Sequence, residues 1–346
     1  MKIGLVGFAG SGKTTVFNAM TGLDAPVGFG GEVRVGTVKV PDDRIRSLSD
    51  IYLPKKTTFA EIAFCDIPGE HGAEKKGLSP RGLQQIRDQE ALCLVLRDFP
   101  NPALEHSPNP LADLEDFHTE CVLADLEIVE RRLERARKEQ APGQEIAAFE
   151  IMKLTLEDEN PLRSVPSQVL NRGYLKGFGL LTDKPLLVAV NTTEDKAGGE
   201  MDGPLSARLQ ELGAAGLVLS ASVESEIADL TPEEQSEFLE DLGLRESALS
   251  RFIQAAYRLL DLISFFTVGE DEVRAWTIRK GTNARKAAGK IHSDLERGFI
   301  RAEVIPYEVF LEHGSEQKVK DQGLLQVQGK DYVVSDADLV SVRFNV

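Results

Sequence analysis

Residues 1–20 have the sequence MKIGLVGFAGSGKTTVFNAM, which combines three structural signals. Its apolar run KIGLV is typical of a short buried β-strand. The glycine-rich GFAGSG that follows predicts a loop, and the residues from Lys13 on have a helical pattern. A strand, a glycine-rich loop and a helix in this order are the context of the phosphate-binding motif G-x4-G-K-[ST]. The motif residues are Gly7, Gly12, Lys13 and Thr14.

Each residue type in this loop has a chemical role. Glycines let backbone N–H groups approach phosphate oxygens without a clash from Cβ, and the following helix directs its positive N-terminal dipole at the same anion. We expect Lys13 to reach the β- and γ-phosphates, Thr14 to ligate Mg²⁺, and Thr15 to contact the α-phosphate. The predicted nucleotide-binding residues of the loop are Phe8, Ala9, Gly10, Ser11, Gly12, Lys13, Thr14 and Thr15.

A second motif, DIPG at residues 66–69, follows an alternating strand pattern later in the chain. We expect the Asp66 carboxylate to hold Mg²⁺, usually through water, and the Gly69 N–H to contact the γ-phosphate. Glu70 stands where Ras-like enzymes place a Gln that orients the attacking water. Glu70 is therefore a candidate catalytic residue, with a solvated loop side chain as the alternative.

A third group of polar residues predicts how the base is read. Asn191 follows a buried strand pattern, and GTPases usually have the sequence Asn-Lys-x-Asp at this place. Here Thr192 replaces the Lys and Glu194 replaces the Asp, and both changes weaken the recognition of guanine, whose lost hydrogen bonds cost about 1–3 kcal/mol each. Asn191 still suits the purine N7 and an adenine amino group, and Asp195 is an alternative to Glu194. Three residues after the next predicted strand border the base: Ser220, Ala221 and Ser222.

Composition narrows the class of protein. The 346 residues are 42% hydrophobic and 28% charged, which is ordinary for a globular protein that buries large cores. A formal charge of −16 argues against whole-surface binding to nucleic acid, although one local basic face is compatible with it. Three well-separated cysteines predict reduced thiols and no zinc site. No apolar run is long enough for a membrane helix or a secretion signal, so we expect a cytoplasmic protein with no membrane contact.

The wider pattern predicts an α/β architecture. Apolar runs at 92–96, 185–190 and 217–219 alternate with helical segments, which indicates a parallel sheet covered on both faces and ligands beyond its carboxyl edge. Apolar residues spaced four and three apart predict a helical coiled-coil hairpin between the strands, with two ordinary amphipathic surface helices as the alternative. The seam residues are Val122, Leu126, Val129, Leu133 and Ala136.

We predict three domains. A discontinuous nucleotide-binding domain comprises residues 1–110 and 180–263, the helical insertion comprises 111–179, and an α+β module comprises 264–346. Within the last module, segment 274–301 contains eight basic and two acidic residues, a net charge of +6. This segment is a candidate face for RNA or the ribosome, with a merely solvated surface as the alternative.

The whole chain resembles the YchF or Obg-like ATPase family of P-loop proteins. The resemblance rests on the phosphate loop, on DIPG, on Asn-x-x-Glu, on SASVESEIADL and, above all, on EVRAWTIRKGTNARKAAGKIHSDLERGFIRAEVI and GKDYVVSDADLVSVRFNV. It implies a P-loop NTPase core of the Ras-like type, the coiled-coil insertion and a C-terminal TGS domain. It also implies ATP preferred over GTP, and association with ribosomes or RNA. A loop His of the family corresponds to His106, which would approach the attacking water, with a merely solvated loop side chain as the alternative.

Three departures from the family pattern bear on catalysis. The phosphate loop reads GFAGSGKTT where the family has a sequence closer to GLPNVGKST, Gly30 stands near the expected Mg²⁺-binding Thr, and Glu70 replaces an apolar residue. The first hypothesis is a slow Mg²⁺-dependent ATPase that acts as a ribosome- or RNA-associated switch, with Lys13, Glu70 and His106 as catalytic candidates. The alternatives are a nucleotide-gated ribosome- or RNA-binding protein with negligible hydrolysis, and a GTP-preferring GTPase. No oligomeric state is predicted.

Overall fold

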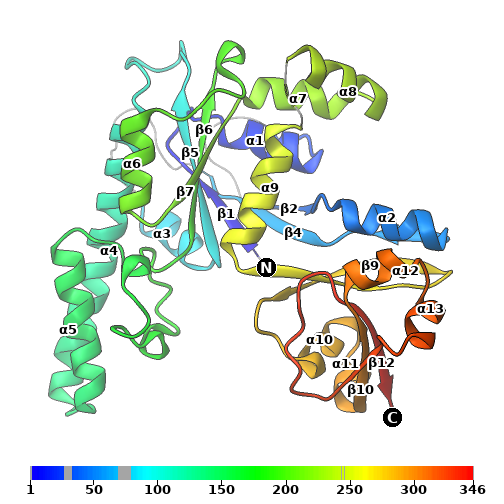
Figure 1. Ribbon diagram of the computed structural model, residues 1–346. Helices are drawn as coiled ribbons and strands as arrows, with labels where there is room; N and C mark the ends of the chain where they lie inside the picture. Colours follow the sequence, from blue (N-terminus) through cyan, green and yellow to red (C-terminus); the bar gives the residue numbers. More distant parts are fainter. Residues whose placement is uncertain (1, 27–32, 69–78, 243, 245, 346) are drawn as a thin grey trace. The chain divides into compact units, whose positions relative to one another are not determined.

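The computed structural model describes residues 2–26, 33–68, 79–242, 244 and 246–345 (Figure 1). The chain divides into two compact units, and each is described by itself. The first contains Met1–Val38 and Ala63–Phe252, and the second contains Lys39–Ile62 and Ile253–Val346. No helix among the described residues is both long and apolar enough to cross a lipid bilayer.

The first unit is built on the predicted parallel sheet. Its strand order is β2-β4-β1-β5-β6-β7, and every described pairing from β4 to β7 is parallel. The central strands are mostly buried apolar runs, as expected for a sheet with helices on both faces. The strands are β1 Lys2–Val6, β2 Arg34–Lys39, β4 Glu61–Asp66, β5 Ala91–Asp98, β6 Leu186–Thr192 and β7 Ala215–Leu219.

Two helical layers cover this sheet (Figure 1). Helices α1 and α7 contact each other on one face, while α4 and α6 contact each other and pack on β5 and β7. The core on the second side joins Leu94 and Val188 of the sheet to Phe117 of α4. The helices are α1 Lys13–Thr21, α3 Pro80–Arg87, α4 Pro110–Lys138, α5 Gly143–Glu157, α6 Gly203–Glu211, α7 Ala221–Asp229, α8 Pro232–Asp241 and α9 Ala248–Leu259.

The long helix α4 and its partner α5 form the predicted helical hairpin (Figure 1). The seam is confirmed, since four of its five residues are buried and the fifth, Leu126, packs against the same cluster. The facing residues of α5 include Phe149 and Met152. Ion pairs cross between the helices, for example Arg132 with Glu145 at 2.7 Å. The hairpin and the segment 162–180 therefore share a hydrophobic core that is distinct from the cluster between α4 and the sheet.

The second unit has a mixed six-stranded sheet in the order β11-β10-β12-β8-β9-β3. Strand β8 pairs antiparallel with β9 and parallel with β12, and β10 pairs antiparallel with both β11 and β12. The strands are β3 Lys56–Thr58, β8 Leu262–Thr267, β9 Glu272–Arg279, β10 Phe299–Ile305, β11 Gln326–Gln328 and β12 Leu339–Phe344. Its helices are α2 Asp43–Tyr52, α10 Ala284–Ile291, α11 Ser293–Arg297, α12 Tyr307–His313 and α13 Glu316–Asp321.

Two segments, residues 39–62 and 253–263, lie in the second unit and not within the predicted boundaries of the nucleotide-binding domain. Residues 39–62 were expected in the nucleotide-binding domain, but their contacts place them in the second unit. Strand β3 pairs in parallel with β9, and the Thr58 hydroxyl donates a hydrogen bond to Glu272 at 2.6 Å. The reason is non-local pairing across more than two hundred residues of chain, which local sequence patterns do not reveal. The division into three domains otherwise stays a prediction.

Candidate nucleotide-binding site

The glycine-rich loop connects β1 directly to the first turn of α1. Gly12 precedes the helix with φ of 82° and ψ of 14°, a left-handed conformation that favours glycine. A Cβ at this position would lie 2.2 Å from Asn191 Nδ2, so space as well as backbone conformation excludes a side chain. Gly12 carries no capping side chain, which leaves the first N–H groups of α1 available to an anion. The loop thus has the geometry of a phosphate cradle.

Charged side chains converge beside this loop at the end of β4. Lys13 is 8% exposed and Asp66 is 3% exposed. Lys13 Nζ lies 3.8 Å from Asp66 Oδ1, and the Thr14 hydroxyl donates to Asp66 Oδ2 at 3.1 Å. Burial lowers the pKa of Lys13, while the Asp66 carboxylate acts in the opposite direction and the charge of Arg34 adds to the lowering. The structure therefore brings together Lys13, Thr14 and Asp66, which the sequence predicts as parts of one site.

Arg34 is a member of this cluster that sequence analysis missed. It lies at the start of β2, and its Nη1 is 3.6 Å from Asp66 Oδ2. The same nitrogen donates to the carbonyl of Pro26 at 3.2 Å. The only signal in the sequence is one basic residue before the second strand, and no motif marks it. Asp66 consequently has a cation near each of its two oxygens.

The donor set at Asp66 fits Mg²⁺. Asp66 Oδ1 is buried and has no hydrogen-bond partner among the described residues. Mg²⁺ is usually held by one or two protein oxygens together with waters and substrate phosphates, and Thr14 and Asp66 offer such a pair. No group of three or more His, Cys, Asp or Glu side chains that could hold a metal occurs in the described part of the chain. The pair of Thr14 and Asp66 therefore suits a Mg²⁺ site that waters and substrate phosphates complete.

Asn191 connects three parts of the site. It is the last residue but one of β6, is 4% exposed, and donates from Nδ2 to the carbonyl of Ser11 at 3.0 Å. Its Oδ1 accepts the N–H of Ala221 at 2.9 Å, at the start of α7. One amide hydrogen and one lone pair remain for a ligand. Asn191 therefore holds the phosphate loop against the loop after β7, a structural task in addition to the predicted contact with the base.

The other predicted base-reading residues lie differently. Ser220 is buried before α7, and its hydroxyl is 3.0 Å from that of Ser222. Thr192 is buried too, but its hydroxyl contacts Asp98 at 3.4 Å, while Glu194 is exposed at the start of a short 3₁₀ helix. Thr192 and Asp195 line a cavity of about 530 Å³, whose floor includes apolar residues of β6, β7 and α6. The structure thus joins Asn191 to the glycine-rich loop and to Ala221, keeps the hydroxyls of Ser220 and Ser222 together, and places Thr192 at the cavity.

The loop between β5 and α4 approaches the phosphate loop and holds His106. Asn101 of this loop donates to the carbonyl of Gly10 at 3.4 Å. The ring of His106 is exposed, and its Nδ1 lies 3.0 Å from Nη2 of the buried Arg97. Three further positions lie outside the residues that the structure describes: Gly30, Gly69 and Glu70.

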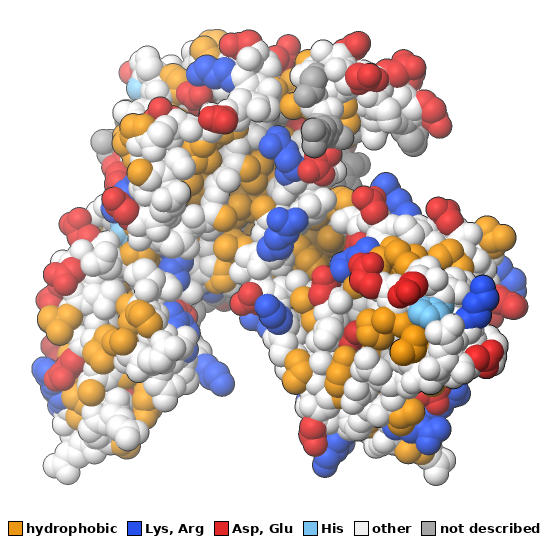
Figure 2. Space-filling view, in the orientation of Figure 1, with side chains coloured by type: hydrophobic (Ala, Val, Ile, Leu, Met, Phe, Trp, Pro, Cys, Tyr) orange, Lys and Arg blue, Asp and Glu red, His pale blue; other side chains and the backbone are white. Residues whose placement is uncertain are grey.

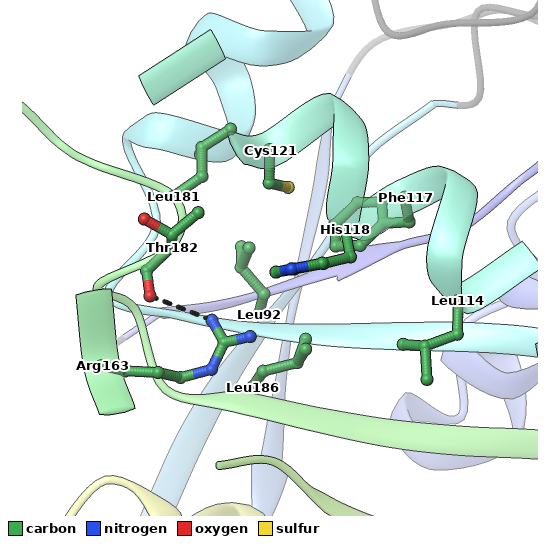
Figure 3. Close-up of a pocket in the computed structure, with 9 residues that line it drawn as sticks. All are labelled: Leu92, Leu114, Phe117, His118, Cys121, Arg163, Leu181, Thr182 and Leu186. Carbon is green, nitrogen blue, oxygen red and sulfur yellow. Dashed lines mark hydrogen bonds between the residues drawn. The ribbon is translucent and has the colours of Figure 1, made fainter. Parts of the chain in front are cut away.

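A small cavity lies away from this site, between α4 and the sheet (Figure 3). His118 and Cys121 of α4 line it together with Arg163, whose Nη1 donates to the carbonyl of Thr182 at 3.1 Å. Burial lowers the pKa of Arg163 to about 10. The cavity measures about 10 Å³, which is room for about one water. We assign it to packing and not to ligand binding.

The surface carries no single sign of charge over the second unit in the view of Figure 2, where basic and acidic side chains alternate. Within segment 274–301, Lys286 pairs with Glu296, Arg297 pairs with Asp294, and Arg274 stacks on Trp276 with 4.0 Å between guanidinium carbon and ring centre.

Helix α8 in the first unit is strongly acidic. Its five acidic residues are Glu233, Glu234, Glu237, Glu240 and Asp241.

Comparisons with known proteins cover the whole chain. A family model named YchF-GTPase_C, described as a protein of unknown function, matches residues 262–345, and one described as a 50S ribosome-binding GTPase matches residues 2–130. The chain is 41% identical over 361 residues to the ribosome-binding ATPase YchF of Bacillus subtilis, with 99% of each chain covered. It is 40% identical over 363 residues to that of Haemophilus influenzae, covering 100% of this chain and 99% of the relative. The solved structure of the Schizosaccharomyces pombe YchF GTPase is similar at a TM-score of 0.89 and 30% identity, covering 99% and 97% of the two chains.

Proposed function

The chain belongs to the YchF family, and on that premise we propose that it is a Mg²⁺-dependent P-loop ATPase that acts as a ribosome- or RNA-associated switch. The observation that carries the proposal is the cluster of Lys13, Thr14 and Asp66 at the end of the glycine-rich loop. All three side chains come from elements that the parallel sheet fixes in place. Such a cluster suits the phosphates of a nucleoside triphosphate.

The roles of the residues follow from their positions. Backbone N–H groups of the loop and of the first turn of α1 bind the phosphate oxygens, and Lys13 stabilises the charge that develops on the γ-phosphate. Thr14 and Asp66 would hold Mg²⁺, which when bound supplies charge neutralisation between the phosphates. Burial of Lys13 places its ammonium in a region of low dielectric, where its attraction to an anion is stronger than in water.

Hydrolysis is tested most directly by single-turnover measurements with ATP. We expect a slow, Mg²⁺-dependent rate that Lys13→Ala removes. Lys176→Ala is the matched control because Lys176 is exposed after a short 3₁₀ helix in the same unit. A rate equal to that of free ATP in the wild type would reject the ATPase and favour nucleotide-gated binding without hydrolysis.

The preference for ATP over GTP rests on the residues after β6. A guanine-reading acid would have to be Glu194 or Asp195, and both are exposed at the start of the 3₁₀ helix. Thr192, which stands in place of the Lys that packs along the base in GTPases, is buried, and its side chain is too short for that contact. The second candidate is a GTP-preferring enzyme, because the related yeast structure and one matching family model carry the word GTPase in their descriptions.

Ribosome association is proposed because the bacterial relatives are named ribosome-binding ATPases. We place the contact on the helical hairpin and on segment 274–301, and the protein in the cytoplasm where ribosomes are. Lys280 and Lys290 are exposed in that segment, so Lys280→Glu with Lys290→Glu tests it. Lys318→Glu, in the same unit but outside the segment, is the control. In cosedimentation with ribosomes we expect the double variant to lose binding and the control to keep it, and equal binding by both would reject this face.

A further inference from the structure

The buried side chain of Arg97 contacts the imidazole ring of His106. Arg97 is the last residue but one of β5 and is 3% exposed. Its Nη1 donates to the carbonyl of Phe99 at 3.1 Å, and its Nη2 lies 3.0 Å from both the carbonyl oxygen and the Nδ1 of His106. Arg97 therefore organises the turn after β5 and touches the imidazole ring at one nitrogen.

The chemistry of the two groups decides which nitrogen of His106 carries the proton. A guanidinium in a protein only donates hydrogen bonds and does not lose its proton, so Nδ1 must accept. The neutral ring then carries its hydrogen on Nε2. The competing arrangement has a hydrogen on Nδ1 that points to the carbonyl of Ser107 at 3.3 Å. That contact is longer, lacks a charged partner and would turn an N–H against the guanidinium, so the first tautomer is favoured.

We propose that Arg97 is a positioning residue that fixes His106 as a hydrogen-bond donor through Nε2, and that His106 does not act as a general base in the hydrolysis. This inference rests on the proposed function, because His106 has a target only if phosphate and water bind at the neighbouring loop. The contact between Asn101 and Gly10 keeps the His106 loop beside that loop. A donor at this place supports a γ-phosphate oxygen or the oxygen of the attacking water, with no proton transferred.

The tautomer is measured directly on the wild-type protein. Nitrogen-15 spectra of the protein labelled at histidine distinguish a hydrogen on Nε2 from one on Nδ1, and His106→Gln identifies the signal among the five histidines. We expect the Nε2–H form at neutral pH. A predominant Nδ1–H form would overturn the proposal, whether or not the protein binds nucleotide.

Substitutions at His106 separate a donor from a base. Gln keeps an N–H donor but is no base, whereas Phe keeps the ring shape without a donor. His106 is exposed, so neither change should disturb folding. In single-turnover hydrolysis we expect a loss on the order of 10²-fold for His106→Phe and a much smaller one for His106→Gln, with ATP affinity unchanged. Equal losses for the two variants would overturn the donor role while leaving the proposed ATPase intact.

Arg97 itself is tested by a conservative pair. Lys keeps a charged donor at this position and Met does not, so we expect Arg97→Lys to retain the Nε2–H tautomer and most of the rate. Arg97→Met should mix the two tautomers and lower the rate as His106→Phe does. A rate loss in Arg97→Met with an unchanged histidine spectrum would mean that Arg97 serves the fold only, and it would overturn the positioning role.

Discussion

Replacement of Asn191 by Ala tests the idea that this side chain joins the phosphate loop to the loop after β7. The variant removes two hydrogen bonds, to the Ser11 carbonyl at 3.0 Å and from the Ala221 N–H at 2.9 Å. Both bonds are buried, so both backbone groups lose their partners without gaining water. A buried donor or acceptor left unpaired costs about 1–3 kcal/mol, and two such groups predict a loss of about 2–6 kcal/mol in the free energy of unfolding.

The assay is urea unfolding of the nucleotide-free protein followed by circular dichroism. With a urea dependence of about 3 kcal/mol per molar, a loss of 3 kcal/mol moves the midpoint by about 1 M. Asn171→Ala is the matched control because Asn171 also accepts one backbone N–H, from Gly173 at 2.9 Å, but is exposed. Water replaces that bond, so we expect a loss below about 1 kcal/mol there. Equal midpoints for the two variants would mean that the Asn191 side chain does not join the two loops.

Three further predictions concern metal, pH and base. Arg34→Ala removes a cation 3.6 Å from Asp66 and with it the repulsion between this guanidinium and a Mg²⁺ ion at Asp66. The Mg²⁺ concentration for half-maximal nucleotide binding should fall, by about tenfold for a relieved repulsion of about 1.4 kcal/mol. An unchanged concentration in a Mg²⁺ titration would contradict this. Burial lowers the pKa of His118 below its usual 6.5, so the unfolded chain binds a proton more readily than the folded one and the free energy of unfolding falls as pH drops below about 6.5. His118→Gln should remove this part of the pH dependence of the urea midpoint. A pH profile identical to that of the wild type would contradict this prediction. Thr192→Lys with Glu194→Asp should shift the ratio of ATP to GTP affinity toward GTP, and an unchanged ratio would mean that these positions do not read the base.

Much of the first unit follows from local patterns in the chain. The motif around Lys13 predicts a strand, a loop and a helix, because phosphate binding needs glycines and a helix start within a few residues, and β1 and α1 confirm it. The seam from Val122 to Ala136 predicts the hairpin because a repeat of four and three residues keeps one face of a helix apolar. Short-range periodicity was sufficient for these elements.

The remaining features depend on contacts between distant residues. Strand β3 joins β9 across the chain, and no local signal in KTT predicts its partner. Arg34 reaches Asp66 because β2 and β4 are neighbours in the sheet. The sequence identifies Arg97 only as part of a strand, and the turn after β5 brings His106 to its guanidinium. A charged residue inside a buried strand pattern was the one available signal for Arg97. Such residues are found by geometry and not by motif.

Binding of ATP with Mg²⁺ at the loop of Lys13 is measured by calorimetry. ATP and GTP, each with Mg²⁺, are titrated into the wild type, Lys13→Ala and Lys176→Ala. We expect ATP to bind more tightly than GTP, and we expect this binding to be lost in Lys13→Ala and kept in Lys176→Ala. Tighter binding of GTP would contradict the expected preference for adenine over guanine. Binding of neither nucleotide, or binding that survives Lys13→Ala, would contradict the proposed nucleotide site.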